Sequence, residues 1–273
     1  AKAKNIEFNL DRLLELDSQI QPLQRELEEL RAQKNNLSKE IGAKNLNSEH
    51  RANLIQSVQT IKTKIEQLES TLQTLVSEFD ELMLYVPQPP RNDVPIGKDE
   101  SENRVIKIHG EIPKFQFKIK DHVELGKLHD MIDIQRGVKL AGSRSYVLKN
   151  MGALLERAIL QFTIDYLLSK NYTPLSVPVL VNPQAMYGTG YFPQGKEQAY
   201  YIEKDNMVLI GTAEVSLTSF HANEILQEKE LPLKYFALSY CFRREAGSYG
   251  KDTYGLYRVH QFQKVEQVII GEA

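Results

Sequence analysis

The stretch "CFRREAGSYGKDTYGLYRVHQFQKVEQV", residues 241–268, combines strand-like alternation with many charged side chains. Two runs, 234–245 and 256–270, alternate in a way that predicts two long strands joined by a loop. The charges have two explanations. Either the segment is a solvated hairpin with cross-strand ion pairs, or the charges converge on a polyanionic ligand.

Alternate residues of a strand share a face, which places the charged side chains of each run together. Arg258, Phe262 and Glu266 share one face of the second run, and Arg243 and Glu245 share one face of the first. Guanidiniums suit phosphate oxygens, a phenyl ring suits a base, and a carboxylate can accept from an exocyclic amine. A nucleoside triphosphate fits this set, although spacing alone leaves the solvated hairpin equally open.

The opposite face of the first run is apolar and is expected to face the core. Its members are Phe236, Leu238, Tyr240 and Phe242. Cys241 is expected to be a small strand residue and His260 a structural one.

The composition is that of an ordinary soluble globular protein, with 41% hydrophobic and 26% charged residues among 273. At about 150 residues per domain, the length predicts two domains. The net charge of −2 gives no overall attraction to nucleic acid. One cysteine excludes an internal disulfide and favours a reducing, cytoplasmic setting. No apolar run approaches the roughly 18 residues of a membrane helix, so no membrane partner is expected.

The first part of the chain carries two heptad runs. Apolar residues step by threes and fours over 13–41 and again over 54–86. Each run sustains about four heptads, which is typical of a coiled coil. Because the break between them is short, residues 1–86 are expected to form an antiparallel α-helical hairpin. Pro22 predicts a kink in the first helix, or a helix that restarts there.

Charge is unevenly distributed along this predicted arm. Residues 31–64 hold seven basic and two acidic side chains, whereas 11–30 and 65–86 are acidic. A basic far half suits a probe whose tip meets nucleic-acid phosphates, and a solvated helix surface explains it equally well. The basic candidates are Arg31, Lys34, Lys39, Lys44, Arg51, Lys62 and Lys64.

The proline-rich segment "VPQPPRNDVPIG", residues 86–97, predicts a linker and a domain boundary after residue 86. Residues 87–273 mix strand and helix patterns, which predicts an α+β domain with an antiparallel sheet. Besides the two long strands, strands are expected over 104–112, 143–149 and 172–181 and a hairpin over 199–211. Helices are expected over 122–135, 151–170 and 213–226. The segment "YGTGYFP", residues 187–193, is either a loop over a pocket or a surface turn.

Three segments resemble motifs of a known family. Residues 241–268 closely resemble motif 2 of class II aminoacyl-tRNA synthetases, in its seryl-tRNA synthetase form. "IGTAEVSL", residues 210–217, resembles that family's serine-binding loop, and "LLERAILQFTIDYLLSKNYTPLSVPVLV", residues 154–181, looks like the dimer-forming motif 1. A coiled-coil arm followed by such a domain is also the family's architecture. The resemblance implies a class II synthetase-type antiparallel sheet flanked by helices.

The resemblance implies a role for each matching residue of the ATP site. Arg243 would hold the α-phosphate and the substrate carboxylate, and Arg258 would reach the γ-phosphate. Glu245 would contact the adenine amino group, and Phe262 would stack on the adenine.

It also implies a serine site and a reaction. Thr212 and Glu266 would hold the ammonium group of L-serine, and Glu214 would line the same pocket. Serine would be activated to seryl-adenylate and transferred to serine tRNA, which would lie along the arm of a homodimer. Alignment and charge stabilisation by the arginines and Mg²⁺ would suffice, so no protein nucleophile is required.

The chain departs from the family at its end, because the family continues to a motif 3 whose arginine clamps ATP opposite Phe262. We therefore expect incomplete aminoacylation activity from residues 1–273 alone. Two alternatives remain. One is a homologue that charges a carrier protein, which the arm and the single cysteine disfavour; the other is a non-catalytic tRNA-binding or coiled-coil interaction module.

Overall fold

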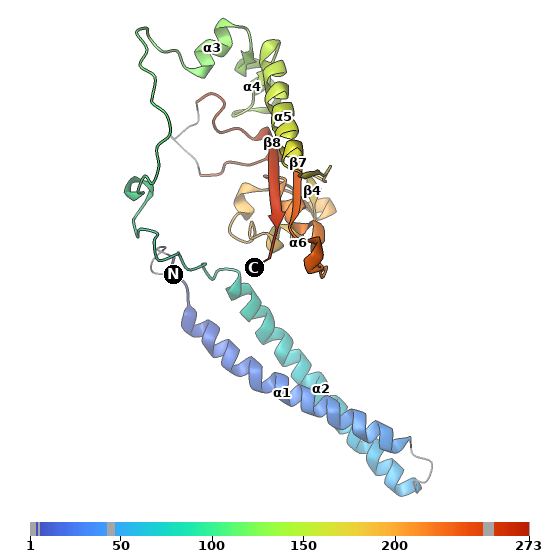
Figure 1. Ribbon diagram of the computed structural model, residues 1–273. Helices are drawn as coiled ribbons and strands as arrows, with labels where there is room; N and C mark the ends of the chain where they lie inside the picture. Colours follow the sequence, from blue (N-terminus) through green and yellow to red (C-terminus); the bar gives the residue numbers. More distant parts are fainter. Residues whose placement is uncertain (1–3, 5, 43–46, 248–253, 273) are drawn as a thin grey trace. The chain divides into compact units, whose positions relative to one another are not determined.

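The computed structural model describes residues 4, 6–42, 47–247 and 254–272. The chain divides into two compact units, Ala1–Glu111 and Ile112–Ala273, which are described separately (Figure 1). The linker therefore groups with the first unit, and the boundary after residue 86 stays a prediction. No helix in the described part of the chain is long and apolar enough to cross a membrane.

The first unit contains the expected helical hairpin. Helices α1 (Leu10–Ile41) and α2 (Ser48–Met83) pack along each other (Figure 1). The buried side chains between them lie at the heptad positions: Leu16, Ile20, Leu27, Ile65 and Leu72. The predicted coiled-coil hairpin is confirmed.

Both helices begin at asparagine caps. The side chain of Asn9 accepts the backbone N–H of Arg12 at 3.1 Å, and Asn47 accepts that of His50 at 2.7 Å. Helix α1 runs through Pro22 without a break, so the alternative of a helix that restarts there is wrong. The buried contacts of Ile20 and Leu27 on either side of Pro22 offset the hydrogen bond that proline cannot make.

The second unit is organised around two long strands. Strands β7 (Leu233–Phe242) and β8 (Gln261–Ile270) pair antiparallel over their whole length. The short β3 (Thr173–Pro174) joins β7 in parallel, so this sheet is mixed, with the order β3-β7-β8. Helix α5 (Met151–Ser169) contacts β7 and β8 (Figure 1), and its predicted span is confirmed.

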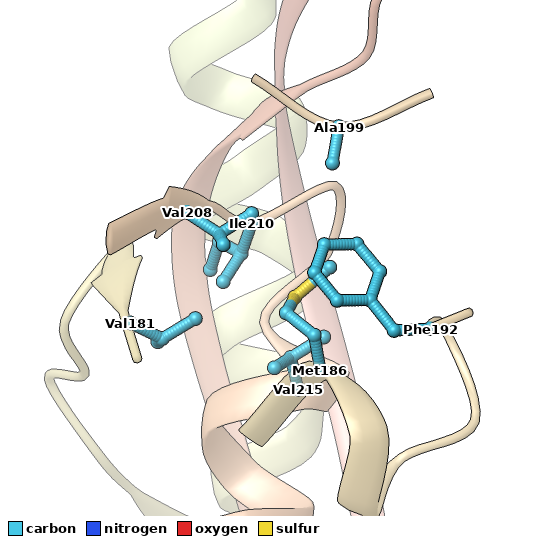
Figure 2. Close-up of a cluster of buried hydrophobic side chains, with 7 residues drawn as sticks. All are labelled: Val181, Met186, Phe192, Ala199, Val208, Ile210 and Val215. Carbon is cyan, nitrogen blue, oxygen red and sulfur yellow. The ribbon is translucent and has the colours of Figure 1, made fainter. Parts of the chain in front are cut away.

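The second unit also contains a second sheet of three strands. Strands β5 (Tyr200–Ile202) and β6 (Met207–Leu209) form the predicted hairpin, and β4 (Leu180–Val181) pairs with the other edge of β6. The cluster in Figure 2 packs against this sheet; its members are Val181, Met186, Phe192, Ala199, Val208, Ile210 and Val215. The segment 187–193 is thus anchored by Met186, which is buried just before it, and by Phe192, which is buried within it.

The remaining elements are short. The pair β1 (Ile132–Asp133) and β2 (Val147–Leu148) is antiparallel. The helices are α3 (His122–Leu128), α4 (Ile134–Ala141), α6 (Pro183–Gly188) and α7 (Glu214–Thr218). The 3₁₀ turns are η2 (Glu100–Glu102), η3 (Lys196–Gln198), η4 (Glu203–Asp205), η5 (Ser219–His221) and η6 (Glu228–Glu230).

Two predicted strands differ from the structure. Residues 104–112 form no strand, and their apolar side chains are exposed, with Ile106 at 88%. Alternation alone does not make a strand without a neighbouring strand to pair with. The strand expected over 172–181 splits into β3 and β4, because the prolines there cannot donate to a ladder.

Further elements are shorter than predicted. The strands expected over 234–245 and 256–270 are β7, which ends at Phe242, and β8, which begins at Gln261, so Arg243, Glu245 and Arg258 lie outside the ladder. The helix over 122–135 ends at Leu128 and gives way to β1 and α4. The helix over 213–226 ends at Thr218, and the strand over 143–149 is reduced to β2.

The face of β7 that was expected to lie in the core is only partly buried. Phe236 is buried, but Leu238 and Tyr240 are 39% and 48% exposed beside a cavity of about 870 Å³ bordered by α4 and α5. The buried side chains of the opposite face are Ala237, Ser239 and Cys241. Small side chains there let α7 pack directly on the sheet, with Leu217 against Ala237.

Leu16→Ala should destabilise the arm, because Leu16 is completely buried between the helices. We expect a loss of about 2–5 kcal/mol, measured by urea unfolding with circular dichroism. Leu14→Ala is the control, since Leu14 is 57% exposed on the same turn and should change stability by less than about 0.5 kcal/mol. Equal losses in the two variants would contradict the packing described here.

Candidate active site

The end of β7 lies beside the segment that links β6 to α7. The backbone N–H of Phe242 donates to the carbonyl of Ile210 at 2.9 Å. The Nε of Arg243 donates to the carbonyl of Gly211 at 3.3 Å. The two segments that resemble motif 2 and the serine-binding loop therefore meet at one place.

The register of β7 and β8 puts Arg243 next to Phe262. Cys241 lies opposite Phe262, so Arg243 continues the same face beyond the end of the strand. Its guanidinium carbon lies 5.2 Å from the centre of the Phe262 ring. A cation at this distance from a ring face is held by the ring quadrupole. The shared face expected from alternation is thus present.

Arg258 and Glu245 form an ion pair across the two ends of the connection between the strands. Nη1 of Arg258 donates to Oε2 of Glu245 at 3.0 Å. Arg144 donates to the backbone carbonyl of Glu245 at 2.7 Å, which holds this residue at a positive φ of 51°. A cavity of about 450 Å³ is lined by Arg243, Glu245, Tyr257 and Arg258. The Nε of Arg258 is buried without a hydrogen-bond partner among the residues described, which suits an incoming anion.

Thr212 and Glu266 form the other half of the site. Thr212 is buried and donates from Oγ1 to Oε2 of Glu266 at 2.6 Å. Lys264 forms an ion pair with the same carboxylate oxygen. Burial alone would raise the pKa of Glu266, but the hydrogen bonds from Lys264 and Thr212 outweigh it and hold this pKa below its usual range. Glu266 is therefore a stable anion for a cationic ligand group.

Tyr191 contacts the same region and was not singled out from the sequence. Its hydroxyl donates to Oε2 of Glu214 at 3.2 Å. Burial and the negative charge of Glu214 raise the pKa of Tyr191 to about 12, so the hydroxyl stays protonated as a donor. The segment 187–193 is thus more than a surface turn, because it brings Tyr191 to a predicted serine-site residue.

Gln198 is a second residue that sequence reasoning missed. Its backbone carbonyl accepts the N–H of Arg244 at 2.8 Å. Its side-chain amide accepts from Ala246 N–H at 3.0 Å and donates to the Ala246 carbonyl at 2.8 Å. Gln198 thereby binds the start of the β7–β8 connection as a neighbouring strand would. No local pattern predicts a contact between residues 48 positions apart.

Cys241 and His260 agree with the structural roles expected for them. Cys241 is fully buried in β7, and burial raises the pKa of its thiol. The ring Nδ1 of His260 donates to the carbonyl of Arg243 at 3.0 Å, while Arg243 N–H donates to the His260 carbonyl at 2.9 Å. These bonds close the base of the connection between β7 and β8.

The basic residues predicted on the arm differ in their surroundings. Arg31 forms an ion pair with Glu69 at 2.7 Å, and Lys62 one with Glu66 at 3.8 Å. Their charges are therefore partly offset. Lys39, Arg51 and Lys64 are exposed and Lys34 is half-buried, whereas Lys44 lies outside the described residues. Their contact with tRNA stays a prediction.

Within the described ranges, no three His, Cys, Asp or Glu residues gather so as to hold a metal ion.

Two family models match this chain at its two ends. Residues 1–90 match the seryl-tRNA synthetase N-terminal domain, and residues 200–273 match the tRNA synthetase class II core domain (G, H, P, S and T). The paired strands, the arginines beside them and the second match together define a class II aminoacyl-tRNA synthetase core.

Comparison with similar proteins identifies the family within this class. The serine–tRNA ligase of Leptospira biflexa is 45% identical over 90% of this chain and 59% of its own length. That of Dictyoglomus turgidum is 42% identical over 96% of this chain and 62% of its own. The crystal structure of seryl-tRNA synthetase from Pyrococcus horikoshii complexed with ATP superposes with a TM-score of 0.82, at 34% identity over 95% of this chain and 62% of that one. The chain belongs to the seryl-tRNA synthetase family. It spans about 60% of the length of these relatives.

Glu266→Gln should lose stability in a pH-dependent way, because its pKa is held below the usual 4.5. Because this pKa is lower in the folded state than in the unfolded state, the ionised carboxylate stabilises the fold at pH values above 4.5. This stabilisation is lost as the pH falls below that value. We expect the variant to be less stable than the parent at about pH 7, with the gap closing below about pH 4.5. Urea unfolding followed by tyrosine fluorescence measures this, since all but one tyrosine lie in the second unit.

Glu203→Gln is the control for this measurement, because Glu203 is exposed on the β5–β6 turn. It should show no gap at either pH. If the difference in unfolding free energy between Glu266→Gln and the parent stayed constant with pH, the charge of Glu266 would not be what Lys264 and Thr212 stabilise.

Proposed function

We propose that the protein carrying this chain activates L-serine with ATP and transfers the seryl group to serine tRNA. The observation that carries the proposal is the meeting of Arg243, Phe262 and the Thr212–Glu266 pair at the end of β7. The family membership supports it, because the relatives are serine–tRNA ligases.

The ATP site would be built from four residues of the β7–β8 region. Phe262 would stack on the adenine, and Glu245 would accept from its exocyclic amine. Arg243 would hold the α-phosphate, and Arg258 would bind the γ-phosphate with the donor that has no partner in the described structure. Mg²⁺ would enter on the phosphates of ATP, as this ion usually does.

The serine site would adjoin the α-phosphate. Glu266 and Thr212 would hold the ammonium group of serine, and Glu214 would line the pocket beside Tyr191. The serine carboxylate would attack the α-phosphorus, and pyrophosphate would leave. A terminal hydroxyl of the tRNA would then attack the seryl carbonyl and release AMP. Arg243 would neutralise charge that develops at the phosphorus, so the reaction needs alignment and electrostatics rather than a protein nucleophile.

The proposal includes a homodimer formed through α5. Six large apolar side chains of this helix are more than half exposed in the single chain: Met151, Leu154, Leu155, Ile159, Phe162 and Tyr166. An apolar stripe of this size is typical of a protein interface. The arm would bind serine tRNA through its basic half, with Lys39, Arg51 and Lys64 exposed for phosphates.

Serine-dependent exchange of pyrophosphate into ATP tests the activation step, using the full-length protein that contains this chain. Arg243→Ala should reduce exchange about a hundredfold or more, because it removes the cation at the α-phosphate. Arg244→Ala is the matched control, since the neighbouring arginine is exposed and should leave exchange unchanged. Absence of exchange with every amino acid would reject the ligase and leave a non-catalytic tRNA-binding module.

Removal of residues 11–86 tests the arm separately. Exchange should persist, because the second unit has its own core, while charging of serine tRNA should be lost. Filter-bound seryl-tRNA measures the charging. Charging at the parent rate would refute the role proposed for the arm.

A further inference from the structure

Helix α3 contacts the outgoing end of the β7–β8 connection through one histidine. The Nε2 of His122 accepts the backbone N–H of Leu256 at 3.0 Å. The Tyr257 and Tyr254 rings meet the His122 ring edge-on, at centroid distances of 4.5 and 6.0 Å. Residues 134 positions apart in sequence are joined here.

Gly255 makes this contact possible. A Cβ at this position would lie 1.9 Å from Nε2 of His122 and 2.9 Å from Cγ2 of Val123. Its φ of +71° is also a conformation that other residues rarely adopt. Two independent constraints therefore require glycine where the backbone passes over the histidine ring.

The histidine is itself held firmly at the start of α3. Asp121 caps the helix by accepting the N–H groups of Val123 at 2.9 Å and Glu124 at 2.8 Å. These backbone bonds, together with a hydrogen bond from the Tyr254 hydroxyl, lower the pKa of Asp121. Val123 is buried at 3% exposure. The ring of His122 is thus a fixed acceptor rather than a mobile surface group.

Leu256 is two residues before Arg258 in the chain. Tyr257 and Arg258 line the 450 Å³ cavity together with Arg243 and Glu245. Val259, the next residue in the chain, is buried. The backbone from Leu256 to Val259 is therefore fixed at both ends, and the side chain of Arg258 emerges between the two anchors.

We propose that His122 is a positioning residue for the nucleotide site: its ring accepts a hydrogen bond from the backbone at Leu256 and so places Arg258 for a phosphate. This inference rests on the proposed function in naming the phosphate as the ligand of Arg258. The contact itself stands on the hydrogen bond, the edge-on ring contact and the absence of room for a Cβ at Gly255.

The hydrogen bond defines the tautomer of His122. A ring that accepts at Nε2 carries its single proton on Nδ1. The ring is surrounded by Asp121 on its own helix and by Tyr254 and Tyr257 from the connection. A glutamine side chain can offer an acceptor to Leu256, whereas alanine cannot.

Hydrogen exchange of the Leu256 amide tests the anchor without reference to any ligand. We expect this amide to be protected in the parent at about pH 8, and to exchange about three- to tenfold faster in His122→Ala. His122→Gln should keep the protection, because its Oε1 can replace Nε2 as the acceptor. Gly255→Ala should lose it, with an unchanged circular dichroism spectrum showing that the fold persists. Protection that is equal in the parent and in His122→Ala would overturn the proposal.

ATP binding by calorimetry then tests the consequence for the nucleotide site. His122→Ala should bind ATP about three- to tenfold more weakly than the parent, because the backbone before Arg258 loses its anchor. His122→Gln should bind ATP as the parent does, since glutamine supplies the acceptor that alanine lacks. His129→Ala is the control, because His129 is exposed at the other end of α3 and its variant should follow the parent.

The outcomes separate the two proposals. If the parent binds no ATP, the proposed function fails, while the exchange of Leu256 still decides whether His122 is an anchor. If ATP binds equally tightly to the parent and to His122→Ala, the anchor does not position the nucleotide site and the inference is wrong.

Discussion

The antiparallel pairing of β7 with β8 is the constraint from which the candidate site takes its geometry. Leu233 lies opposite Ile270 and Phe242 opposite Gln261, without a bulge between them. A slip of one residue would turn Phe262 and Glu266 to the α5 side of the sheet, away from Arg243. The apolar contacts of α7 with one face and of α5 with the other specify the register, because each face must meet its own helix.

Around this register the charges of the site are arranged in partnered groups. Glu245 contacts Arg258, and Glu266 contacts both Lys264 and Thr212. Ligand binding in the proposed function would therefore exchange one polar partner for another, which avoids the cost of leaving a buried charge alone. The unpartnered Nε of Arg258 is the point where the described site has spare donor capacity.

Distant segments complete the site by binding backbone rather than side chains. Gln198 holds Ala246 at the start of the connection, Arg144 holds the Glu245 carbonyl, and His122 holds Leu256 at its end. Beyond Phe242 and before Gln261, the strand ladder no longer pairs the backbone N–H and C=O groups. Each of these three side chains binds some of those groups instead. The orientation of Arg243 and Arg258 therefore depends on residues from three other parts of the second unit.

The sequence by itself determined the helical arm, the α+β class and which residues share a face within each of the two long strands. These features follow from heptad and two-residue periodicities, which are local properties of the chain. Only the tertiary structure decided that residues 104–112 form no strand, that α7 ends at Thr218, and that Leu238 and Tyr240 border a cavity. It also decided the contacts of Tyr191, Gln198 and His122, which join residues 23 to 134 positions apart. Periodicity states which way a side chain faces, but the partner on that face comes from another part of the chain and is set by packing.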